Sequence, residues 1–503
     1  MSSQRRIVVL GGGVSGLSFS YYLNLYKNGV LRAKNALLPQ ITVIEKGDTL
    51  GGWMKSYRDP STGAVFSKGP RSLRGVGYEA QSSLSLVEDL GLSDEVIAVT
   101  RRQPAGKKRL IYSGGQLHQL PTEFLGFFQK LPFLGRSLAG IAYTETRTPS
   151  CPEKKGQDES IHSFVSRRFG IDVADKLADP FLRGIIAGDV RETSIQTMAP
   201  RFKTVEDNYG SLLWNIRKVP EQVVGRVKNS VLCRRALDEK WAMWNLQSGL
   251  GALPTALHKK LLEQGADVRT GCACTQLEWK DDRFLVHTEE GVVEADVVVA
   301  ALNAKRLADL LPESCESLSS KLSALPIAHV ATATLEYPES ETRHVMQAFG
   351  HLIPSGEGED ILGVIYNSEI FPEHDREDKS TKRFTAMIGG AWFDEVLGSN
   401  PTTTDVEEIA MKSLARQLDI AAPPVNIVTD ILWDAIPQYP VGHPNTMLSI
   451  DKEITDSGLP LSLIGPSYDS PGAHSCIHRA KVQAMNLLTQ WNDIDSKASS
   501  ASQ

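Results

Sequence analysis

The chain has 503 residues, of which 41% are hydrophobic and 23% charged, and its formal net charge at pH 7 is -6. This length is sufficient for two or three domains with separate cores, and the composition is that of a globular protein. The acidic balance argues against a nucleic-acid-binding protein, and six scattered cysteines are too few for a disulfide framework.

The first segment of the chain predicts a dinucleotide site. An apolar strand at residues 7–10 runs into a G-x-G-x-x-G motif at residues 11–16, and a helix is expected to follow through Leu23. The first glycine permits the turn, the second lets the backbone approach a pyrophosphate, and the third allows the helix to pack closely on the sheet. Free N–H groups at the start of the helix would bind the phosphates. The candidates are Gly11, Gly12, Gly13, Val14, Ser15 and Gly16.

An acidic residue closes the second predicted strand. Glu45 follows the strand at residues 41–44, and its carboxylate can accept hydrogen bonds from ribose hydroxyls. It lies beyond the usual spacing of about 20 residues, because residues 27–40 lengthen the connection. A chance glutamate after an ordinary βαβ unit is the alternative, but the strand and helix around the motif favour a dinucleotide site.

The middle of the chain is rich in predicted helices, notably at residues 80–90 and 160–182. Residues 124–134 gather aromatic side chains beside a lysine, which would suit insertion at a membrane surface if they were exposed. A buried helix pair is the alternative, and the sequence leaves both open. Residues 145–160 predict a mobile loop.

Later segments predict a return to the nucleotide-binding domain. The expected elements are a helix at 252–262, a hairpin at 284–295, buried strands at 296–301 and 461–465, and a helix at 476–490. Residues 322–430 predict strands, including 331–336 and 363–366, that would form a sheet over a substrate cavity. We interpret Cys272 and Cys274 as neighbours on one face of an extended segment, and we expect no metal site, because no second pair completes one.

Several motifs in chain order resemble those of the oxygen-dependent protoporphyrinogen oxidase family, within the flavin amine-oxidase superfamily. Gly51-Gly52-Trp53 resembles its GGW, and residues 66–74 resemble its E-x-G-P-R segment, with Lys68 and Ser67 in place of an apolar residue and an acid. Residues 109–121 resemble R-x-x-Y-x-G-G-x-L-H-x-L-P, and residues 183–188 follow R-G-x-x-A-G. Residues 349–354 and 436–439 match later segments.

The resemblance implies FAD as the cofactor and a set of residues around it. Arg71 would place a cation near the flavin ring, although a structural salt bridge is the alternative. The further cofactor-binding residues that the resemblance implies are Lys46, Gly52, Trp53, Gly69, Pro70, Ser72, Ala273, Pro466, Pro471, Gly472 and Ala473.

The resemblance also implies a tetrapyrrole substrate. Arg109 would pair with a propionate, and Gly184 would lie close to a pyrrole ring; read alone, Arg109 is a solvated charge in a basic run. Leu352, Ile365 and Met387 would sandwich the macrocycle between apolar side chains, although each alone predicts ordinary core. We read His118 and His351 as structural histidines and assign no catalytic acid or base.

The last motif departs from the family pattern. The family has G-x-S-Y-x-G followed by N-D-C-I, whereas this chain has Ser470 at the second glycine and His474-Ser475 at the Asn-Asp pair. The close glycine is expected to have moved to Gly472, and the flavin contacts of this segment are open.

The implied reaction is FAD-dependent oxidation of protoporphyrinogen IX to protoporphyrin IX in haem biosynthesis, with three O2 consumed and three H2O2 released. An amine oxidase or a carotenoid desaturase is one alternative, although only Tyr439 and Tyr468 could supply the aromatic cage of an amine oxidase. A flavoprotein without turnover is the other, and the altered His474-Ser475 pair is its support.

The expected fold class is α/β, with a discontinuous Rossmann-like FAD-binding domain, a mixed α+β substrate domain and a helical membrane-associating domain. We assign residues 1–80, 245–320 and 430–495 to the FAD-binding domain and residues 81–210 to the helical domain. Residues 211–244 and 321–429 form the substrate domain, and residues 496–503 are expected to be a disordered tail.

The family resemblance also predicts where the protein acts and with what. It implies the intermembrane-space side of the mitochondrial inner membrane, peripheral membrane contact, a homodimer and hand-over of product to ferrochelatase. The sequence has no apolar run of 18 residues that would span a membrane, and we expect no cleavable leader before the first strand.

Overall fold

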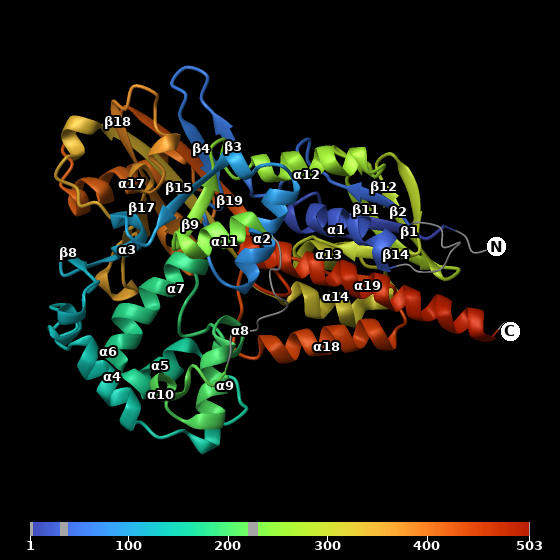
Figure 1. Ribbon diagram of the computed structural model, residues 1–503, viewed down its shortest axis with the longest axis horizontal. Coiled ribbons are helices and arrows are strands. Elements are labelled where there is room, and N and C mark those ends of the chain that lie inside the picture. Colours follow the sequence, from blue (N-terminus) through green and yellow to red (C-terminus); the bar gives the residue numbers. More distant parts are fainter. Residues whose placement is uncertain (1–3, 31–38, 220–229, 502–503) are drawn as a thin grey trace.

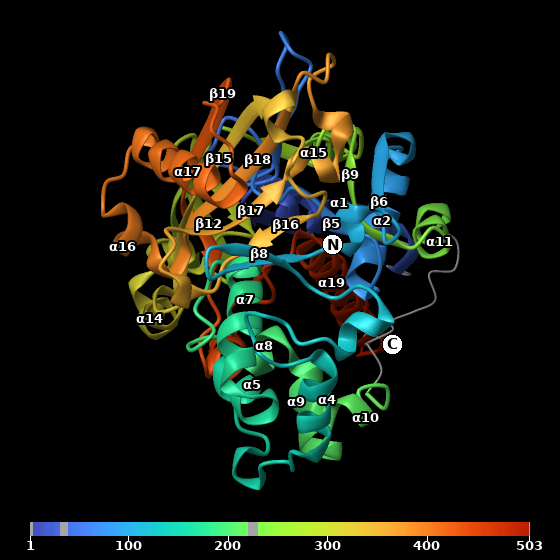
Figure 2. The same cartoon turned by 90° about the vertical axis from the view of Figure 1, so that its left-hand side faces the viewer.

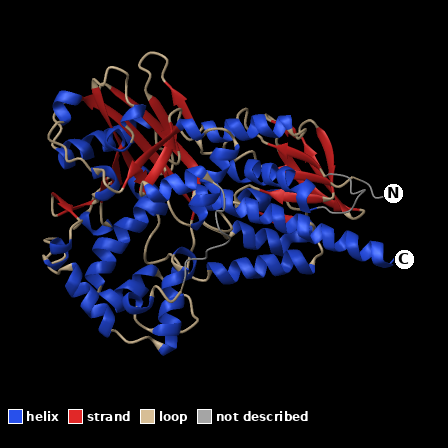
Figure 3. Ribbon diagram, viewed as in Figure 1, coloured by secondary structure: helices blue, strands red, loops and turns tan. Residues whose placement is uncertain are grey.

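The structure is a computed structural model, and it describes residues 4–30, 39–219 and 230–501. Two sheet-containing parts lie side by side, with a group of helices below them (Figure 1). The strands gather in the two upper parts, whereas the lower group consists of helices and loops (Figure 3). The site depends on how these three parts meet.

The first part is built on a five-stranded parallel sheet. Its order is β10-β2-β1-β14-β20, formed by Asp267–Arg269, Gln40–Ile44, Arg6–Leu10, Val297–Ala300 and Leu461–Leu463. The apolar runs of the central strands are buried on both faces, as expected of a parallel sheet covered on both sides. Strands far apart in the sequence therefore lie next to each other.

Helices and a hairpin cover the two faces of this sheet. On one face α1 (Val14–Val30), α12 (Ala252–Glu263) and α19 (Ala473–Ala501) enclose a single core with side chains of β1 and β2. The opposite face packs against the three-stranded sheet β11-β12-β13 (Cys274–Lys280, Arg283–Thr288, Gly291–Ala295) and against α13 (Ala304–Leu310) and α14 (Glu316–Ser323). The predicted hairpin at 284–295 is confirmed.

The second part is a seven-stranded sheet of mixed direction. Its order is β19-β15-β18-β17-β16-β7-β8, formed by Asn426–Pro437, Ile327–Pro338, Thr381–Gly389, Ile361–Tyr366, Gly350–Leu352, Leu110–Ser113 and Gln116–Gln119. Because side chains alternate along a strand, Ala331, Ala333 and Leu335 join the core under α17 (Thr403–Leu418), while Thr332 and Thr334 face the other way. This second face looks into the cavity described below, and the strands predicted at 331–336 and 363–366 are confirmed.

The third part is the group of helices at the bottom of Figure 1, seen from another side in Figure 2. Its helices are α4 (Leu138–Arg147), α5 (Ile161–Phe169), α6 (Ile171–Val173), α7 (Asp179–Ile186), α8 (Ile195–Met198), α9 (Pro200–Tyr209) and α10 (Leu212–Asn215). The single helix predicted at 160–182 is wrong. Gly170 ends α5 with a φ of 110°, and the π-helical turn Ala174–Ala178 precedes α7.

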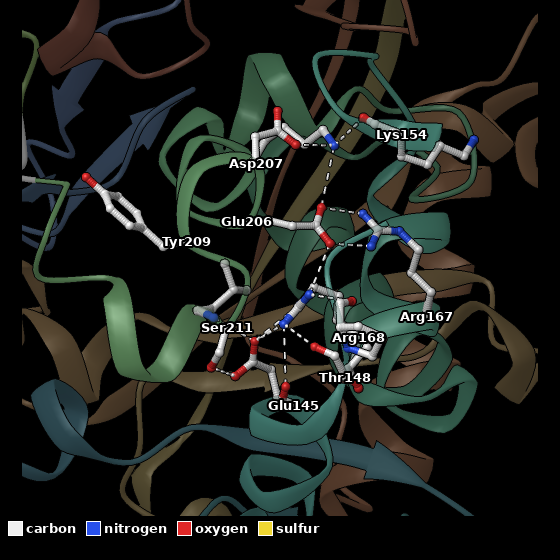
Figure 4. Close-up of polar contacts among 12 residues, drawn as sticks. Glu145, Thr148, Lys154, Arg167, Arg168, Glu206, Asp207, Tyr209 and Ser211 are labelled. Carbon is white, nitrogen blue, oxygen red and sulfur yellow. Dashed lines mark hydrogen bonds and ion pairs between the residues drawn. The ribbon is translucent and has the colours of Figure 1, made fainter. Parts of the chain in front are cut away.

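A buried network of charges holds this helical group together (Figure 4). Glu145 and Arg168, both 0% exposed, pair directly, and the Glu145 carboxylate also accepts a hydrogen bond from the backbone N of Leu212 at 2.6 Å. Glu206 accepts hydrogen bonds from both Arg167 and Arg168. Since these residues belong to α4, α5, α9 and α10, the network connects four helices.

The mobile loop predicted at 145–160 is therefore wrong at both ends. Glu145 lies inside α4, and Glu159 is 3% exposed and paired with Arg167. The polar composition of the segment suggested solvent, but Glu145 and Glu159 are buried and paired with arginines.

The aromatic segment at 124–134 divides into an exposed and a buried part. Phe124 and Leu125, in the short turn Phe124–Phe128, are each 76% exposed, whereas Leu131 and Phe133 are buried. The buried helix pair is thus wrong, because the segment forms one 3₁₀ turn and a following irregular stretch. Within the described ranges no helix combines the length and the apolar character needed to cross a membrane.

The C-terminal helix is longer than predicted. It runs from Ala473 to Ala501, so the disordered tail expected at 496–503 is wrong as far as Ala501, and residues 502–503 lie outside the described residues. Helix α2 (Tyr78–Asp89) confirms the helix predicted at 80–90. The strands near the cavity form two small sheets: β3-β4 (Lys55–Arg58, Val65–Lys68) and β5-β9-β6 (Leu73–Arg74, Trp241–Leu246, Val96–Thr100).

Candidate functional site

A cavity of 590 Å³ lies where the two sheets and the helical group meet. One end is lined by the glycine motif after β1 and by Glu45 after β2, and the other by the inner face of the seven-stranded sheet and by α7. Its volume is within the range of about 300–1,000 Å³ that is typical of ligand sites. A long ligand could therefore extend from the carboxyl ends of parallel strands to an apolar wall.

The three glycines at the nucleotide end have different surroundings. Gly11 has a φ of 103°, and an added Cβ there would lie 2.9 Å from the carbonyl O of Ala301. A Cβ on Gly16 would lie 2.1 Å from the carbonyl O of Gly11, so the helix packs directly on the turn. A Cβ on Gly13 would meet nothing within 4 Å, which leaves open space above the backbone that lines the cavity. These are the features that a pyrophosphate site requires.

Glu45 lines the same end of the cavity. Its Oε2 accepts a hydrogen bond from the backbone N of Gly12 at 2.8 Å, and its Oε1 accepts one from Gly47 at 2.8 Å. Each carboxylate oxygen has a second lone pair, so the side chain is fixed in place and can still accept a hydrogen bond from a ribose hydroxyl. Together with the space above Gly13, this arrangement fits the adenosine diphosphate part of FAD.

The segment 65–72 passes along the middle of the cavity. Gly69 has a φ of 82°, and a Cβ there would lie 2.3 Å from the carbonyl O of Trp53, so the two walls touch. Arg71 lines the cavity, and its Nη1 donates to the carbonyl O of Gly69 at 3.1 Å. Loss of water around the guanidinium lowers the pKa of Arg71 to about 10, which leaves it a cation at pH 7.

Among the described residues, Arg71 does not form the structural salt bridge that the sequence left as an alternative. Asp430 pairs with Lys68 at 2.7 Å, and among the described residues Arg71 has no ion pair. Its charge is thus available to a ligand in the cavity.

The segment before α19 contributes another wall. Pro466, Pro471, Ala473 and Cys476 line the cavity. Gly472 does not line it, because its Cα faces the imidazole of His474, and a Cβ there would lie 2.8 Å from Cε1 of that ring.

At the far end, three of the predicted substrate residues line the cavity: Gly184, Ile365 and Met387. Leu352 lies behind Gly184, and Arg109 lies behind Phe349, with its guanidinium 4.7 Å from the centre of that ring. Burial lowers the pKa of Arg109, whose Nη1 donates to the carbonyl O atoms of Ala105 and Lys108. Arg109 therefore lies behind the wall, with its Nη1 engaged by backbone carbonyls.

Some predicted residues lie outside the cavity wall. Lys46 is exposed, and Ala273 accepts a hydrogen bond from the backbone N of Glu289 at 3.3 Å. The predicted residues that do not line the cavity are Gly12, Gly16, Lys46, Ala273, Gly472, Arg109 and Leu352. Gly12 and Gly16 shape the turn through their backbone, and contacts of the others with a ligand stay predictions.

Sequence reasoning missed several polar residues of the wall. Arg383 is 3% exposed; its Nε donates to Asp375 at 3.1 Å and its Nη1 to the carbonyl O of Val65 at 2.6 Å. His374 is held by the carbonyl O of Leu246, and burial lowers its pKa to about 4. No local pattern pointed to either, whereas the apolar-polar alternation of 331–335 could have placed Thr332 and Thr334 on the cavity face.

Four other side chains weighed in the sequence stay outside the cavity wall. His351 contacts Tyr366 and Gln417, and His118 contacts the carbonyl O of Ser113, so both are held as structural histidines. The hydroxyl of Tyr439 donates to Pro466 at 2.6 Å and that of Tyr468 to Leu302 at 3.1 Å. These two tyrosines therefore form no aromatic cage at the cavity.

The described part of the chain contains no group of three or more His, Cys, Asp or Glu side chains arranged to hold a metal ion. Cys272 is buried and Cys274 begins β11, and neither lines the cavity. The donors that face the cavity suit an organic cofactor with phosphates and hydroxyls.

Comparison with known proteins agrees with this geometry. The family model described as flavin containing amine oxidoreductase matches residues 14–456. The chain is 35% identical to protoporphyrinogen oxidase of Bos taurus over 487 residues, covering 96% of this chain and 98% of that protein. It is 34% identical to protoporphyrinogen oxidase of Homo sapiens over 493 residues, with coverage of 96% and 98%.

A solved structure shares the fold. The crystal structure of a candidate protoporphyrinogen oxidase from Exiguobacterium superposes with a TM-score of 0.76 at 22% identity, covering 97% of this chain and 100% of the other.

Proposed function

The chain belongs to the protoporphyrinogen oxidase family, within the flavin containing amine oxidoreductases, and we propose that it oxidises protoporphyrinogen IX to protoporphyrin IX. It is a flavin-dependent oxidoreductase, and the cofactor is FAD. The observation that supports the substrate best is that one continuous cavity joins a dinucleotide end at Gly13 and Glu45 to an apolar end at Gly184, Ile365 and Met387.

The residues present fit FAD in order along the cavity. The open space above Gly13 would take the pyrophosphate, Glu45 the ribose, and the segment Gly69 to Ser72 would pass the flavin ring. When bound, FAD supplies the redox chemistry: the substrate loses a hydride from a bridging carbon, and dioxygen is reduced to hydrogen peroxide.

The protein's own residues bind, orient and exclude water. The side chains of Ile365 and Met387 and the bare backbone of Gly184 offer a flat apolar wall to a macrocycle. Arg71 would favour negative charge developing on the flavin ring, because its guanidinium is held beside Gly69 and forms no ion pair with any residue that the structure describes. Pyrrole N–H groups release the protons, so we assign no side chain as catalytic acid or base.

The full conversion removes six hydrogen atoms in three two-electron steps. Three molecules of dioxygen then give three of hydrogen peroxide, which balances the six electrons and six protons. This stoichiometry predicts a ratio of three peroxides formed for each porphyrin.

The test is fluorescence-detected oxidation of protoporphyrinogen IX by the purified flavoprotein, corrected for autoxidation, with peroxide measured in parallel. We expect oxygen-dependent porphyrin formation that is lost in Gly13→Asp, because a carboxylate would fill the pyrophosphate space with negative charge. Gly356→Asp is the matched control, since Gly356 is exposed and a Cβ there also meets nothing within 4 Å.

Two outcomes would contradict the proposal. Bound FAD without porphyrin formation would indicate another flavin oxidase, and its substrate class would then be sought among amines and carotenoids. Absence of bound FAD would indicate a protein without turnover.

Coproporphyrinogen III, which has four carboxylates instead of two, serves as a competing substrate that tests the choice of tetrapyrrole.

The location and partners of the protein belong to the same proposal. We propose peripheral contact with the intermembrane-space side of the mitochondrial inner membrane through the turn Phe124–Phe128, whose Phe124, Leu125 and Phe128 are exposed beside Lys130. Replacing these three apolar residues with serine should abolish co-sedimentation with cardiolipin-containing vesicles without loss of turnover. Val425→Ser, at an apolar residue that is 55% exposed elsewhere, should leave vesicle binding intact.

A homodimer and product hand-over to ferrochelatase complete the proposal. Sedimentation velocity of the flavoprotein tests the first: a monomer at all concentrations would contradict it. Porphyrin transfer in the presence of a trap for free porphyrin tests the second, and transfer that the trap abolishes would contradict hand-over.

A further inference from the structure

We propose that Arg74, Glu79 and His474 form a positioning cluster that fastens two walls of the FAD cavity together, and that Glu79 supplies the carboxylate that the related motif has at position 475. The inference rests on the proposed function only in taking FAD as the occupant of the cavity. It concerns the departure at His474-Ser475, where the family pattern has Asn-Asp.

The contact between Arg74 and His474 joins residues 400 positions apart. The Nη2 of Arg74 lies 2.6 Å and its Nε 3.1 Å from Nε2 of His474. An arginine can only donate, so Nε2 must be the acceptor, and the ring is neutral with its hydrogen on Nδ1. This histidine is 8% exposed whereas Arg74 is exposed, so the contact lies at the edge of the interior.

Glu79 completes the cluster from helix α2. Its Oε2 accepts a hydrogen bond from the hydroxyl of Ser475 at 2.5 Å and lies 3.5 Å from Nε2 of His474. Glu79 therefore contacts both residues at which this chain departs from the family pattern. An aspartate at position 475 would bring a second carboxylate to the same place, and this chain has a serine there.

The cluster lies directly behind the cavity wall. Ser72, two residues before Arg74, and Ala473, just before His474, both line the cavity. The cluster thus holds the start of α19 against the segment that follows Arg71. Two nearby groups are engaged elsewhere: Arg479 with Asp469, and His478 with Ser82.

This arrangement allows a test in which substitutions transfer the carboxylate from position 79 on α2 to position 475 on α19. Arg74 is exposed, so Glu79→Gln acts mainly on Ser475, whose hydroxyl loses its charged acceptor. Ser475→Asp adds a second carboxylate beside the first, and like charges at this distance repel. With both changes the cluster again holds one carboxylate, to which the new amide at position 79 can donate a hydrogen bond, and the acidic residue of the family motif is reproduced.

The experiment is a double-mutant cycle on FAD affinity. Apoprotein of each variant is titrated with FAD, and quenching of flavin fluorescence gives Kd. We expect each single change to raise Kd about tenfold and the double variant to return to within about threefold of the wild type, since contacting charged residues couple strongly. Single variants with the wild-type Kd, or a double variant whose Kd rises by the product of the two single increases, would overturn the proposal.

A matched control separates positioning from general stability. Glu88 lies on the same helix and accepts a hydrogen bond from Ser230 at 2.6 Å, away from α19. Glu88→Gln should lower the thermal unfolding midpoint of the apoprotein and leave the Kd for FAD unchanged. An equal loss of FAD affinity in Glu88→Gln would show that Glu79 acts only through stability.

This readout also keeps the two proposals apart. A wild-type protein that binds FAD but forms no porphyrin contradicts the proposed substrate and leaves the cycle measurable. A wild-type protein that binds no FAD contradicts both.

Discussion

Gly184 lies against Leu352 with no room for a side chain between them: a Cβ on Gly184 would lie 2.5 Å from Cδ2 of Leu352. Gly184 lines the cavity, whereas Leu352 forms the layer behind it. The contact therefore sets how far α7 approaches the seven-stranded sheet, and with it the width of the proposed substrate wall.

Gly184→Val should raise the KM for protoporphyrinogen IX about tenfold or more, because the new side chain must either displace Leu352 or occupy part of the cavity. FAD affinity should be unchanged, since the nucleotide end lies at the other side of the cavity. Steady-state kinetics and the flavin titration check the two statements. A combined Gly184→Val/Leu352→Ala variant should regain part of the loss, and no regain would contradict the role given to Leu352.

Arg109 is expected to act at the rim. Its guanidinium stacks on Phe349, a cavity residue, and its Nη1 contacts only carbonyl oxygens. Arg109→Met should raise KM while kcat stays near the wild-type value, because a bidentate partner for a propionate is lost but the reacting carbon is not touched.

A neighbouring basic residue and an esterified substrate serve as controls. Lys107→Met removes a cation paired loosely with Glu123 and should leave KM unchanged. The dimethyl ester of the substrate should not distinguish wild type from Arg109→Met. If Arg109→Met lowered kcat and left KM unchanged, a carboxylate contact would be excluded.

The charge network of the helical group makes a stability prediction. Glu145 has 0% exposure, pairs with Arg168 and also accepts hydrogen bonds from Ser211 and Leu212. Glu145→Gln should destabilise the helical group by about 3 kcal/mol, because buried Arg168 loses one of its two carboxylate partners and keeps only Glu206, which Arg167 shares.

Thermal unfolding and limited proteolysis of α4 to α10 measure this effect. Glu339→Gln is the control, since Glu339 pairs with an arginine that is 72% exposed, and such surface pairs contribute about 0–1 kcal/mol. Equal shifts in both variants would contradict the importance of burial.

The nucleotide end of the site could be predicted from the sequence because its information is local. Gly11, Gly13 and Gly16 follow one strand directly, and Glu45 ends the next, so four residues already describe a strand, a turn and a ribose partner. The fold class was accessible for the same reason, since the later apolar strands have the composition of a parallel sheet.

The rest of the fold and of the site depends on contacts between segments that are distant in the sequence. Arg383 lies in the cavity wall because β18 places it beside Val65, and no local sequence pattern near position 383 predicts that contact. The sequence placed Glu145 in a mobile loop and Arg168 in one long helix, because composition cannot show that two charges pair in the interior. Glu79 reaches position 475 only through the packing of α2 on α19.

His351 gives the last prediction, a pH dependence of stability. Its Nδ1 contacts the hydroxyl of Tyr366 at 2.9 Å and its Nε2 contacts Oε1 of Gln417 at 2.7 Å, so Nε2–H donates to the amide and the neutral ring is satisfied. Burial lowers the pKa of His351 to about 4 from an ordinary value of 6.5. The unfolded chain therefore binds a proton more readily than the folded one between these two values.

The sign follows from this difference. The free energy of unfolding that neutral His351 contributes is fully present above pH 6.5 and is lost as pH falls toward 4. The loss is about 2 kcal/mol at pH 5. His351→Gln can keep a donor toward Gln417 and an acceptor toward Tyr366, but it takes up no proton. The thermal unfolding midpoint of this variant should fall less between pH 7.5 and pH 5 than that of the wild type. A slope should remain, because burial also lowers the pKa of His374 and of His474 to about 4 and lowers the pKa of His443 and His478. Parallel curves for the two proteins would show that His351 is not buried in its neutral form.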